Sequence, residues 1–355
     1  MRIWQLLARN WDKIMEVDIC NSYSPEYDEF VKRMPNTKLC HLFAWAEMVM
    51  RTFGHKSFYL VARDGNQVHG VLPLIQIKSH IFGNRLVSQA FGNYGGPLAN
   101  GPDVFEALYT RAVELATEHG CESIEFRNLQ PLNYDLHSQT DKVSMLLPLN
   151  PDPYQLWRNF NKHTRKHIRK AEKSGLTVVD GGLDLLDEFY EVWTIRMHQL
   201  GTPCYPRKLF RNIMETFSEQ SRVFVVRLRG SPVGVQFAYY FNGMVECRWA
   251  ATRIEYNPLS PNTLLCWSVI RYYCLTGMSW LDFGRSTIGS GQYKFKKQWG
   301  SQPVQLHYQY WTYPGHELSL VKPNEPKYKR KVELWKKLPL WATRLAGPYL
   351  SCSLP

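Results

Sequence analysis

The sequence predicts an α/β protein in which one structural unit occurs twice. In the first half, FYLVARDGNQVHGVLPLIQIKS predicts two strands around the turn Asp64-Gly65-Asn66, and a helix and a short strand follow. In the second half, strands around Gly230-Ser231 and Asn242-Gly243 are again followed by a helix and a strand. This order recurs after roughly 160 residues, which indicates duplication of one α/β unit. The alternative is that any two α/β domains share hairpins and helices.

The helices and final strands of the two units have the expected patterns. PDVFEALYTRAVELATEHG places apolar residues on one helical face and stops at Gly120, before the alternating strand ESIEFRN. Its counterpart SPNTLLCWSVIRYYCLTG stops at Gly277, before the strand SWLDFG.

A basic segment connects the two units. PDPYQLWRNFNKHTRKHIRKAEKSGLTV predicts one helix that Asp152 caps, Pro153 opens and Gly175 closes. One helical face carries the stripe Trp157, Phe160, Thr164, Ile168 and Ala171. The remaining surface carries the cations Arg158, Lys162, Arg165, Lys166, Arg169, Lys170 and Lys173. We expect this helix to open the second domain, which gives domains at 1–150 and 151–315 and a tail at 316–355.

The net charge and the hydropathy of the chain indicate which partners it can bind and in which cell compartment it is expected. The 355 residues carry a net charge of +12, which favours anionic partners, although a merely soluble basic protein has the same balance. The first residues, MRIWQLLARNWDKIMEV, do not read as a secretory signal, and no apolar stretch is long enough to span a bilayer. We therefore expect a cytoplasmic protein that at most touches the inner membrane. The basic, aromatic tail either lies in a membrane interface or packs on its own domain.

Several chemistries are excluded by missing motifs. DFG at 282–284 lacks a kinase catalytic loop, and neither a GxxxxGK[ST] phosphate loop nor a GxSxG elbow is present. His163 and His167 have a spacing that can bind zinc, but the cations around them repel a divalent metal. We expect no metal.

The stretch DFGRSTIGSGQYKFKKQWG carries the candidate site. A strand at 280–283 is expected to end at Gly284, and a loop with hydroxyls, glycines and lysines follows. Such a loop suits an anion or the oxyanion of an acyl transfer, while the plainer alternative is a basic hairpin at a sheet edge. A strand, PVQLHYQYW, is expected after Trp299-Gly300.

The segment FKKQWG at 295–300 resembles the FK-x-x-[FW]-G segment of the FemAB-like transferases. The resemblance extends to LDFGRS, RKHIRKAEKSGL and FYEVWTIRMHQLGTP, and it covers roughly residues 25–315. In the first half, GHKSFYLVA, GVLPL and FGNYGGPLA resemble the branch associated with exosortase (PEP-CTERM) and exopolysaccharide loci.

This resemblance implies two tandem acetyltransferase-like (GNAT) domains, each a mixed sheet flanked by helices. It also implies transfer of an amino acid from aminoacyl-tRNA to the peptide of a peptidoglycan precursor. The family's active-site pair falls on Phe295 and Lys296, with the lysine steadying the acyl group and a nearby phosphate. The helical arm of some tRNA-using members and the acetyl-CoA pyrophosphate loop are not visible, so aminoacyl-tRNA and acyl-CoA both stay open as donor.

Further candidates follow from the residues around this pair. Asp282 is a candidate base or orienter, or else it caps the following turn. Candidate phosphate or substrate contacts are Arg285, Ser286, Gln292 and Lys294. Tyr94 is expected in the acceptor groove or against a glycine turn, and either Arg248 or Trp249 is expected to face the site.

Three functional classes compete at this point. The first is an acyl- or aminoacyltransferase that acts on an envelope, peptidoglycan or exopolysaccharide precursor. The second is a nucleic-acid-binding module that uses Arg165, Lys166, Arg169 and Lys170 of the basic helix. The third is a catalytically silent scaffold for polysaccharide assembly. The sequence leaves the oligomeric state open.

Overall fold

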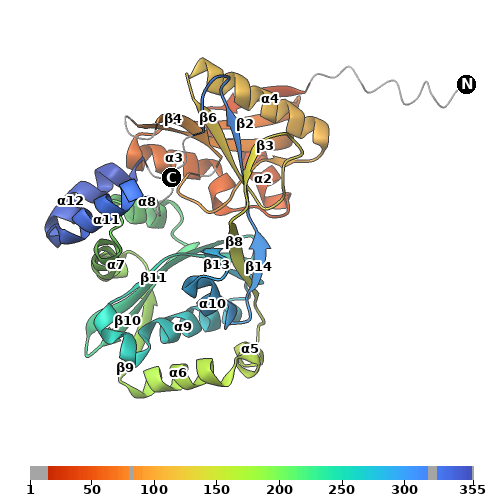
Figure 1. The fold of residues 1–355 in the computed structure, drawn as a ribbon. Helices are drawn as coiled ribbons and strands as arrows, with labels where there is room; N and C mark the ends of the chain where they lie inside the picture. Colours follow the sequence, from red (N-terminus) through yellow and green to blue (C-terminus); the bar gives the residue numbers. More distant parts are fainter. Residues whose placement is uncertain (1–14, 80–82, 89, 319–325, 354–355) are drawn as a thin grey trace, which may run out of the picture.

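The computed structural model describes residues 15–79, 83–88, 90–318 and 326–353, so most of the N-terminal segment lies outside the described residues. Two mixed β-sheets lie one above the other, each flanked by helices (Figure 1). This confirms the predicted α/β class and the two-unit organisation. No helix in the described ranges has the length and apolar character needed to cross a membrane.

The first sheet has the strand order β1-β2-β3-β4-β6-β15-β7, with β5 beside β3. Alternate residues of β2 point to opposite faces, so Leu60 packs on α4 while Tyr59 packs on α2 and α3. The first-half elements are β1 (Glu16–Cys20), α2 (Pro25–Arg33), η2 (Leu39–His41), α3 (Phe43–Phe53), β2 (Ser57–Asp64), β3 (Gln67–Ser79), β4 (Gly83–Val87), β5 (Leu98–Ala99), α4 (Pro102–Glu118), β6 (Ser123–Asn128) and β7 (His137–Gln139).

The second sheet has the order β14-β8-β13-β12-β11-β10-β9, with α6 and α9 on one face and α7 and α8 on the other. Its elements are β8 (Lys142–Pro148), α5 (Pro153–Asn159), α6 (Lys162–Lys173), β9 (Leu176–Gly181), η3 (Leu183–Leu185), α7 (Leu186–Leu200), α8 (Arg207–Thr216), β10 (Ser221–Leu228), β11 (Ser231–Phe241), β12 (Met244–Thr252), η4 (Ile254–Leu259), α9 (Pro261–Leu275), β13 (Trp280–Thr287), α10 (Gly291–Lys297), β14 (Gln302–Gln305) and β15 (His307–Thr312).

The two units share one topology. In each, three antiparallel strands lead to a fourth, a helix follows, and the next strand pairs in parallel with the fourth. These parallel pairs are β4 with β6 and β12 with β13. The helices α4 and α9 that connect them end before Gly120 and Gly277, as predicted, and both glycines have positive φ. The shared pairing supports the predicted duplication.

The sheets exchange one strand each. β8 comes from before residue 150 but lies between β13 and β14 of the second sheet. β15 follows β14 after one residue, Leu306, yet it lies between β6 and β7 of the first sheet. The prediction of one continuous strand for PVQLHYQYW was therefore wrong, because the chain crosses between sheets at Leu306. The domain boundary between residues 150 and 151 stays a prediction. It does not coincide with the division of the strands between the two sheets, because β8 and β15 each lie in the sheet of the other half.

The connecting basic segment is two helices, so the prediction of one helix was wrong. α5 ends at Asn159 with Phe160 as its C-terminal cap, and α6 begins after Asn161, whose side chain accepts a hydrogen bond from Thr164 N. Phe160 turns inward at this break and packs against Trp267 and Trp299. In the tail, α11 (Pro326–Lys337) and α12 (Leu340–Ser351) pack beside α7 (Figure 1).

Candidate functional site

The site lies where β12 and β13 stop pairing. Their parallel register covers only three residues of each strand and ends at Glu246 and Asp282. β13 then continues along β8 through a bulge between Asp282 and Arg285, in which Gly284 has a φ of +77°. The predicted strand end at Gly284 was wrong, because the bulge lets the strand run on to Thr287.

Asp282 is a buried carboxylate at this bulge, and it accepts three hydrogen bonds. Its Oδ1 receives Ser144 Oγ at 2.6 Å and the backbone N–H of Gly284 at 2.7 Å. Its Oδ2 receives the hydroxyl of Tyr94, from the first half of the chain, at 2.8 Å. Burial and the nearby carboxylate raise the pKa of Tyr94, so this hydroxyl stays protonated and donates. The contact from Gly284 is the predicted turn cap.

The segment after the bulge is the short helix α10, so the alternative of a basic hairpin was wrong. Ser290 caps the helix through its side chain, which accepts a hydrogen bond from Tyr293 N. Phe295 is half-buried and meets the fully buried Trp299 edge to face, with ring centroids 6.2 Å apart. Phe295 thus fixes α10 on the core and turns the next residue, Lys296, toward β13.

Lys296 reaches the bulge and donates to two backbone carbonyls. Its Nζ lies 2.9 Å from Gly284 O and 3.0 Å from Arg285 O. Burial lowers the pKa of this ammonium from 10.5 to about 8, while the negative charge of Asp282 opposes the shift. At neutral pH the group is therefore a partly buried cation whose third N–H is not used by these two carbonyls.

The other residues predicted to contact phosphate or substrate lie on β13 and on α10. Arg285 is exposed and donates to the hydroxyl of Tyr308 over 3.4 Å, whereas Ser286 is buried and its hydroxyl has no hydrogen-bond partner among the described residues. Gln292 and Lys294 are exposed. A helix turns about 100° per residue, so Lys294 points away from Lys296. Sequence proximity to Lys296 therefore does not bring Lys294 to the bulge.

A loop from the first half, residues 91–96, covers the bulge and is held through its carbonyls. Arg248 donates to Phe91 O at 2.8 Å, Arg127 donates to Gly92 O at 2.8 Å, and the hydroxyl of Tyr308 donates to Asn93 O. Tyr94 is buried and has Lys38 Nζ 4.5 Å from its ring centroid. Trp249, by contrast, packs in the core against Phe210 and Phe237.

Sequence reasoning missed several of these residues. Ser144, Arg127 and Tyr308 lie on alternating strands, where their residue types give no signal of a site. Arg127 and its partner Glu125, 2.7 Å apart, are buried because the loop and β15 cover a strand face that looks solvent-exposed in sequence. Only the strand exchange brings Tyr308 into contact with this loop.

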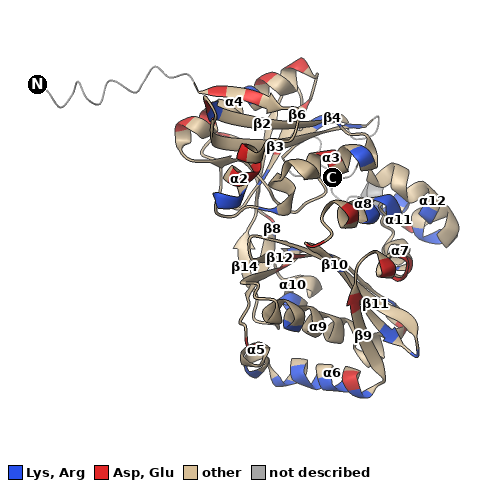
Figure 2. Cartoon of the chain, turned by 180° about the vertical axis from the view of Figure 1, so that it is seen from behind, with Lys and Arg blue, Asp and Glu red and all other residues tan. Residues whose placement is uncertain are grey.

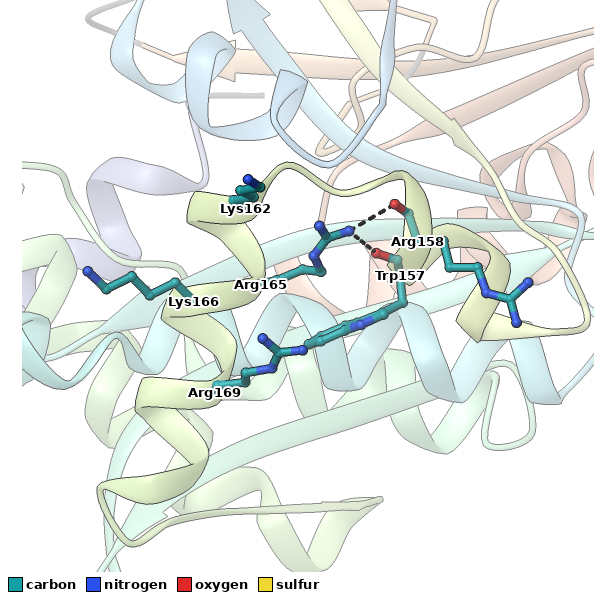
Figure 3. A pocket seen from close by; sticks show the side chains of 6 residues that line it. All are labelled: Trp157, Arg158, Lys162, Arg165, Lys166 and Arg169. Atoms are coloured by element: carbon teal, nitrogen blue, oxygen red, sulfur yellow. Dashed lines mark hydrogen bonds between the residues drawn. The ribbon is translucent and has the colours of Figure 1, made fainter.

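The basic helix carries a second feature, a surface hollow of about 590 Å³ lined by Trp157, Arg158, Lys162, Arg165, Lys166 and Arg169 (Figure 3). Arg165 donates to the carbonyls of Trp157 and Arg158 at the end of α5, and Arg169 lies over the Trp157 ring. A second hollow adjoins it and adds Lys170 and Lys173. Lys and Arg positions recur along α6 (Figure 2). The two arginines thus have internal partners, although Arg169 is exposed, as Lys166 and Lys170 are.

The histidine pair on α6 has protein partners. His163 and His167 lie 3.1 Å apart through their Nε2 atoms, and His167 Nδ1 contacts Ser260 Oγ at 2.8 Å. Burial and neighbouring cations lower the pKa of His167. In the described part of the chain, no group of three His, Cys, Asp or Glu side chains is arranged to hold a metal ion.

Comparison with known proteins places the site in a recognised domain. Residues 158–297, which include Asp282 and Lys296, match the family described as acetyltransferase (GNAT) domain. The chain is 24% identical over 240 residues to the lipid II:glycine glycyltransferase of Staphylococcus epidermidis, which covers 60% of this chain and 56% of that protein. The Staphylococcus aureus enzyme of that name is 25% identical over 227 residues, covering 57% and 53%. The chain thus spans about half the length of these relatives.

Solved structures agree on the fold. The crystal structure of FemX has a TM-score of 0.65 at 16% identity and covers 82% of this chain and 97% of its own. A tandem GNAT protein from the clavulanic acid biosynthesis pathway has a TM-score of 0.54 at 12% identity, covering 86% and 100%. The exosortase-associated branch is not tested by these matches and stays a prediction. The matched domain and the solved structures thus show the GNAT fold, and together with the sequence relatives they support the predicted resemblance to the FemAB-like proteins.

Proposed function

We propose that this protein is an N-acyltransferase that moves an acyl or aminoacyl group onto an amine of a cell-envelope precursor. One observation carries the proposal: the ammonium of Lys296 is held at the bulge where β12 and β13 separate. The glycyltransferase relatives and the GNAT match support the same class of reaction.

The proposed reaction needs a positive charge beside the carbonyl oxygen of the donor. The acceptor amine attacks the activated carbonyl carbon, a C–N bond forms, and the bond to the oxygen or sulfur of the donor breaks. The amine loses one proton, and the leaving group takes one up. Negative charge develops on the carbonyl oxygen, and Lys296 can donate its remaining N–H to that oxygen. One preorganised donor of this kind is worth about 3–4 kcal/mol in the transition state.

Asp282 has a positioning role in this proposal. Its three hydrogen bonds occupy both carboxylate oxygens, so it holds the bulge and the Tyr94 loop in place rather than accepting the amine proton. Phe295 likewise acts through packing. We propose Arg285 and Ser286, which neighbour the bulge, as contacts for phosphate on the donor or acceptor.

Donor and acceptor are proposed by chemical class. Aminoacyl-tRNA and acyl-CoA both carry phosphates that the basic helix α6 suits, and neither requires a metal in the mechanism. For the acceptor we propose a peptidoglycan or exopolysaccharide precursor, used at the inner membrane surface.

Replacement of Lys296 by Met tests the proposal. The matched control is Lys294→Met, which removes an exposed lysine from the same helix. Purified protein is offered acetyl-CoA or charged tRNA with a precursor amine, and amide formation is followed by mass spectrometry. We expect Lys296→Met to lower turnover at least a hundredfold while the control keeps it. Equal turnover of the two variants would remove Lys296 from the mechanism.

A second candidate function is polyanion binding without catalysis, as a nucleic-acid- or precursor-binding scaffold. The hollows along α6 favour it, because Lys166 and Lys170 are exposed there beside aromatic and arginine side chains. Replacement of these two lysines by Gln leaves the internal contacts of Arg165 and Arg169 intact. Three results together would favour the scaffold over the transferase. The wild type would bind tRNA, the variant would bind it more weakly, and no amide product would form with either donor.

A further inference from the structure

The C-terminal helix α12 has its polarity reversed relative to an ordinary surface helix. Its small and polar residues Thr343, Gly347 and Ser351 are buried. Its large residues Trp341, Leu345 and Tyr349 point outward and are 70%, 65% and 76% exposed. A surface helix normally buries its apolar face. This helix instead exposes it.

Specific contacts fix the helix in this orientation. A Cβ added to Gly347 would lie 2.9 Å from the backbone nitrogen of Cys204, so this face sits directly against the protein. Ser351 Oγ donates to Cys204 O at 3.0 Å, and Arg344 Nε donates to Thr194 Oγ1 at 3.0 Å. Rotation of α12 to bury the apolar side chains would break all of these contacts.

α11 and the turn after it also expose apolar side chains. Leu334 and Leu338 are 65% and 42% exposed, and His198 holds the turn between the helices by a 2.8 Å contact with Leu338 O. The outer stripe consists of Leu334, Leu338, Trp341, Leu345 and Tyr349. Scattered single apolar residues on a surface need no explanation, but five on one helical pair mark an interaction site.

Basic residues surround the outer stripe. Residues 326–352 contain seven Lys and Arg against one acidic residue, and that residue, Glu333, pairs with Lys336 at 2.8 Å. Arg330 and Lys337 are exposed within one helical turn of Leu334. Figure 2 shows basic positions along α11 and α12. An apolar stripe with Trp and Tyr, bordered by lysines, has the composition of a helix that lies in the interface of an anionic bilayer.

We propose that the outer stripe is a membrane-docking surface, which inserts its apolar side chains among the lipids of an anionic bilayer while the surrounding cations contact headgroups. The net positive charge of the tail disfavours docking of a second copy through the same face, because like charges would meet. The inference rests on the geometry of α11 and α12 and does not require the proposed acyl transfer.

Vesicle flotation with the full chain tests the proposal without donor or acceptor. The probes are vesicles of phosphatidylcholine alone and of phosphatidylcholine mixed with phosphatidylglycerol. We expect binding to the anionic vesicles, weakened when salt is raised from about 0.1 M to about 1 M because the charges become screened. Trp341→Ala and Leu345→Ala should each weaken binding by about tenfold.

The matched control is Leu275→Ala, because Leu275 is 63% exposed, similar to Leu345, but lies on α9. We expect this variant to bind vesicles like the wild type. The proposal is overturned if the wild type does not bind anionic vesicles, or if the stripe variants bind as tightly as the control. It is also overturned if gel filtration shows a dimer that Trp341→Ala dissociates, since the stripe would then be covered by a second copy. Amide formation is assayed separately, so either proposal can fail alone.

Discussion

Lys296→Met should increase the stability of the protein while it removes activity. Burial lowers the pKa of Lys296 from 10.5 to about 8, a difference worth about 3 kcal/mol against the charged form at neutral pH. The variant escapes this penalty, but it leaves Gly284 O and Arg285 O without their lysine donor, at a cost of about 1 kcal/mol each. We expect a net gain of about 1 kcal/mol at pH 7.

The pH dependence of the stability separates two effects of the substitution, the removal of the buried charge and the loss of the two hydrogen bonds. Between about pH 8 and 10.5 the unfolded lysine binds a proton and the folded one does not, so the stability of the wild type rises with pH. Below the folded pKa both states are protonated and the penalty is fully present. The wild type should therefore gain about 2 kcal/mol relative to the variant between pH 7 and about pH 9.5.

Urea unfolding followed by circular dichroism at these two pH values provides the measurement. The free energy of unfolding of the variant is subtracted from that of the wild type. This removes the contribution of all other titrating groups, because they are common to both proteins. If the difference in the free energy of unfolding between the two proteins stays constant from pH 7 to about pH 9.5, the lowered pKa of Lys296 is refuted. Lys296 would then titrate alike in the folded and unfolded states.

Three further perturbations give distinct results. Tyr94→Phe should lower the free energy of unfolding by about 1.5–3 kcal/mol in urea, because the buried carboxylate of Asp282 loses a donor; an unchanged midpoint would contradict this. Gly284→Ala should destabilise more than Gly289→Ala, since both have positive φ but only Gly284 has a side-chain amide 3.1 Å from the added Cβ; equal midpoints would show that this crowding does not matter. Lys166→Gln should reduce the salt slope of tRNA binding by about one at unchanged stability, and an unaltered slope would show that Lys166 contacts no phosphate.

The regular elements of the fold could be predicted because local patterns determine them. The hairpin of β2 and β3 follows from alternation around Asp64-Gly65, and α4 and α9 end at glycines that adopt positive φ. Around the site, Asp282 as a turn cap also followed from local sequence. These features depend on residues close together in the chain.

The parts that were missed depend on distant residues or on competing patterns. The order Tyr-Lys-Phe-Lys alternates like a strand, but the cap at Ser290 and the packing of Phe295 on Trp299 make it helical. No local pattern could pair Tyr94 with Asp282, because 188 residues separate them. The crossing at Leu306 was equally invisible, since the residues on both sides of it favour strands.

The exchanged strands also determine how the two halves can move. A protein whose halves are joined by a single linker can open and close around its substrate. Here β8 and β15 each lie inside the sheet of the other half, paired on both sides. The two sheets are therefore joined by two chain crossings, at residues 140–141 and at Leu306. Separating the sheets would also break the contacts of Tyr94 with Asp282 and of Arg248 with Phe91 O, so the sheets are tied to each other more tightly than by one linker. The loop of residues 91–96 and the bulge at Gly284 thus form a seam that ties the first half of the chain to the second sheet beside Lys296.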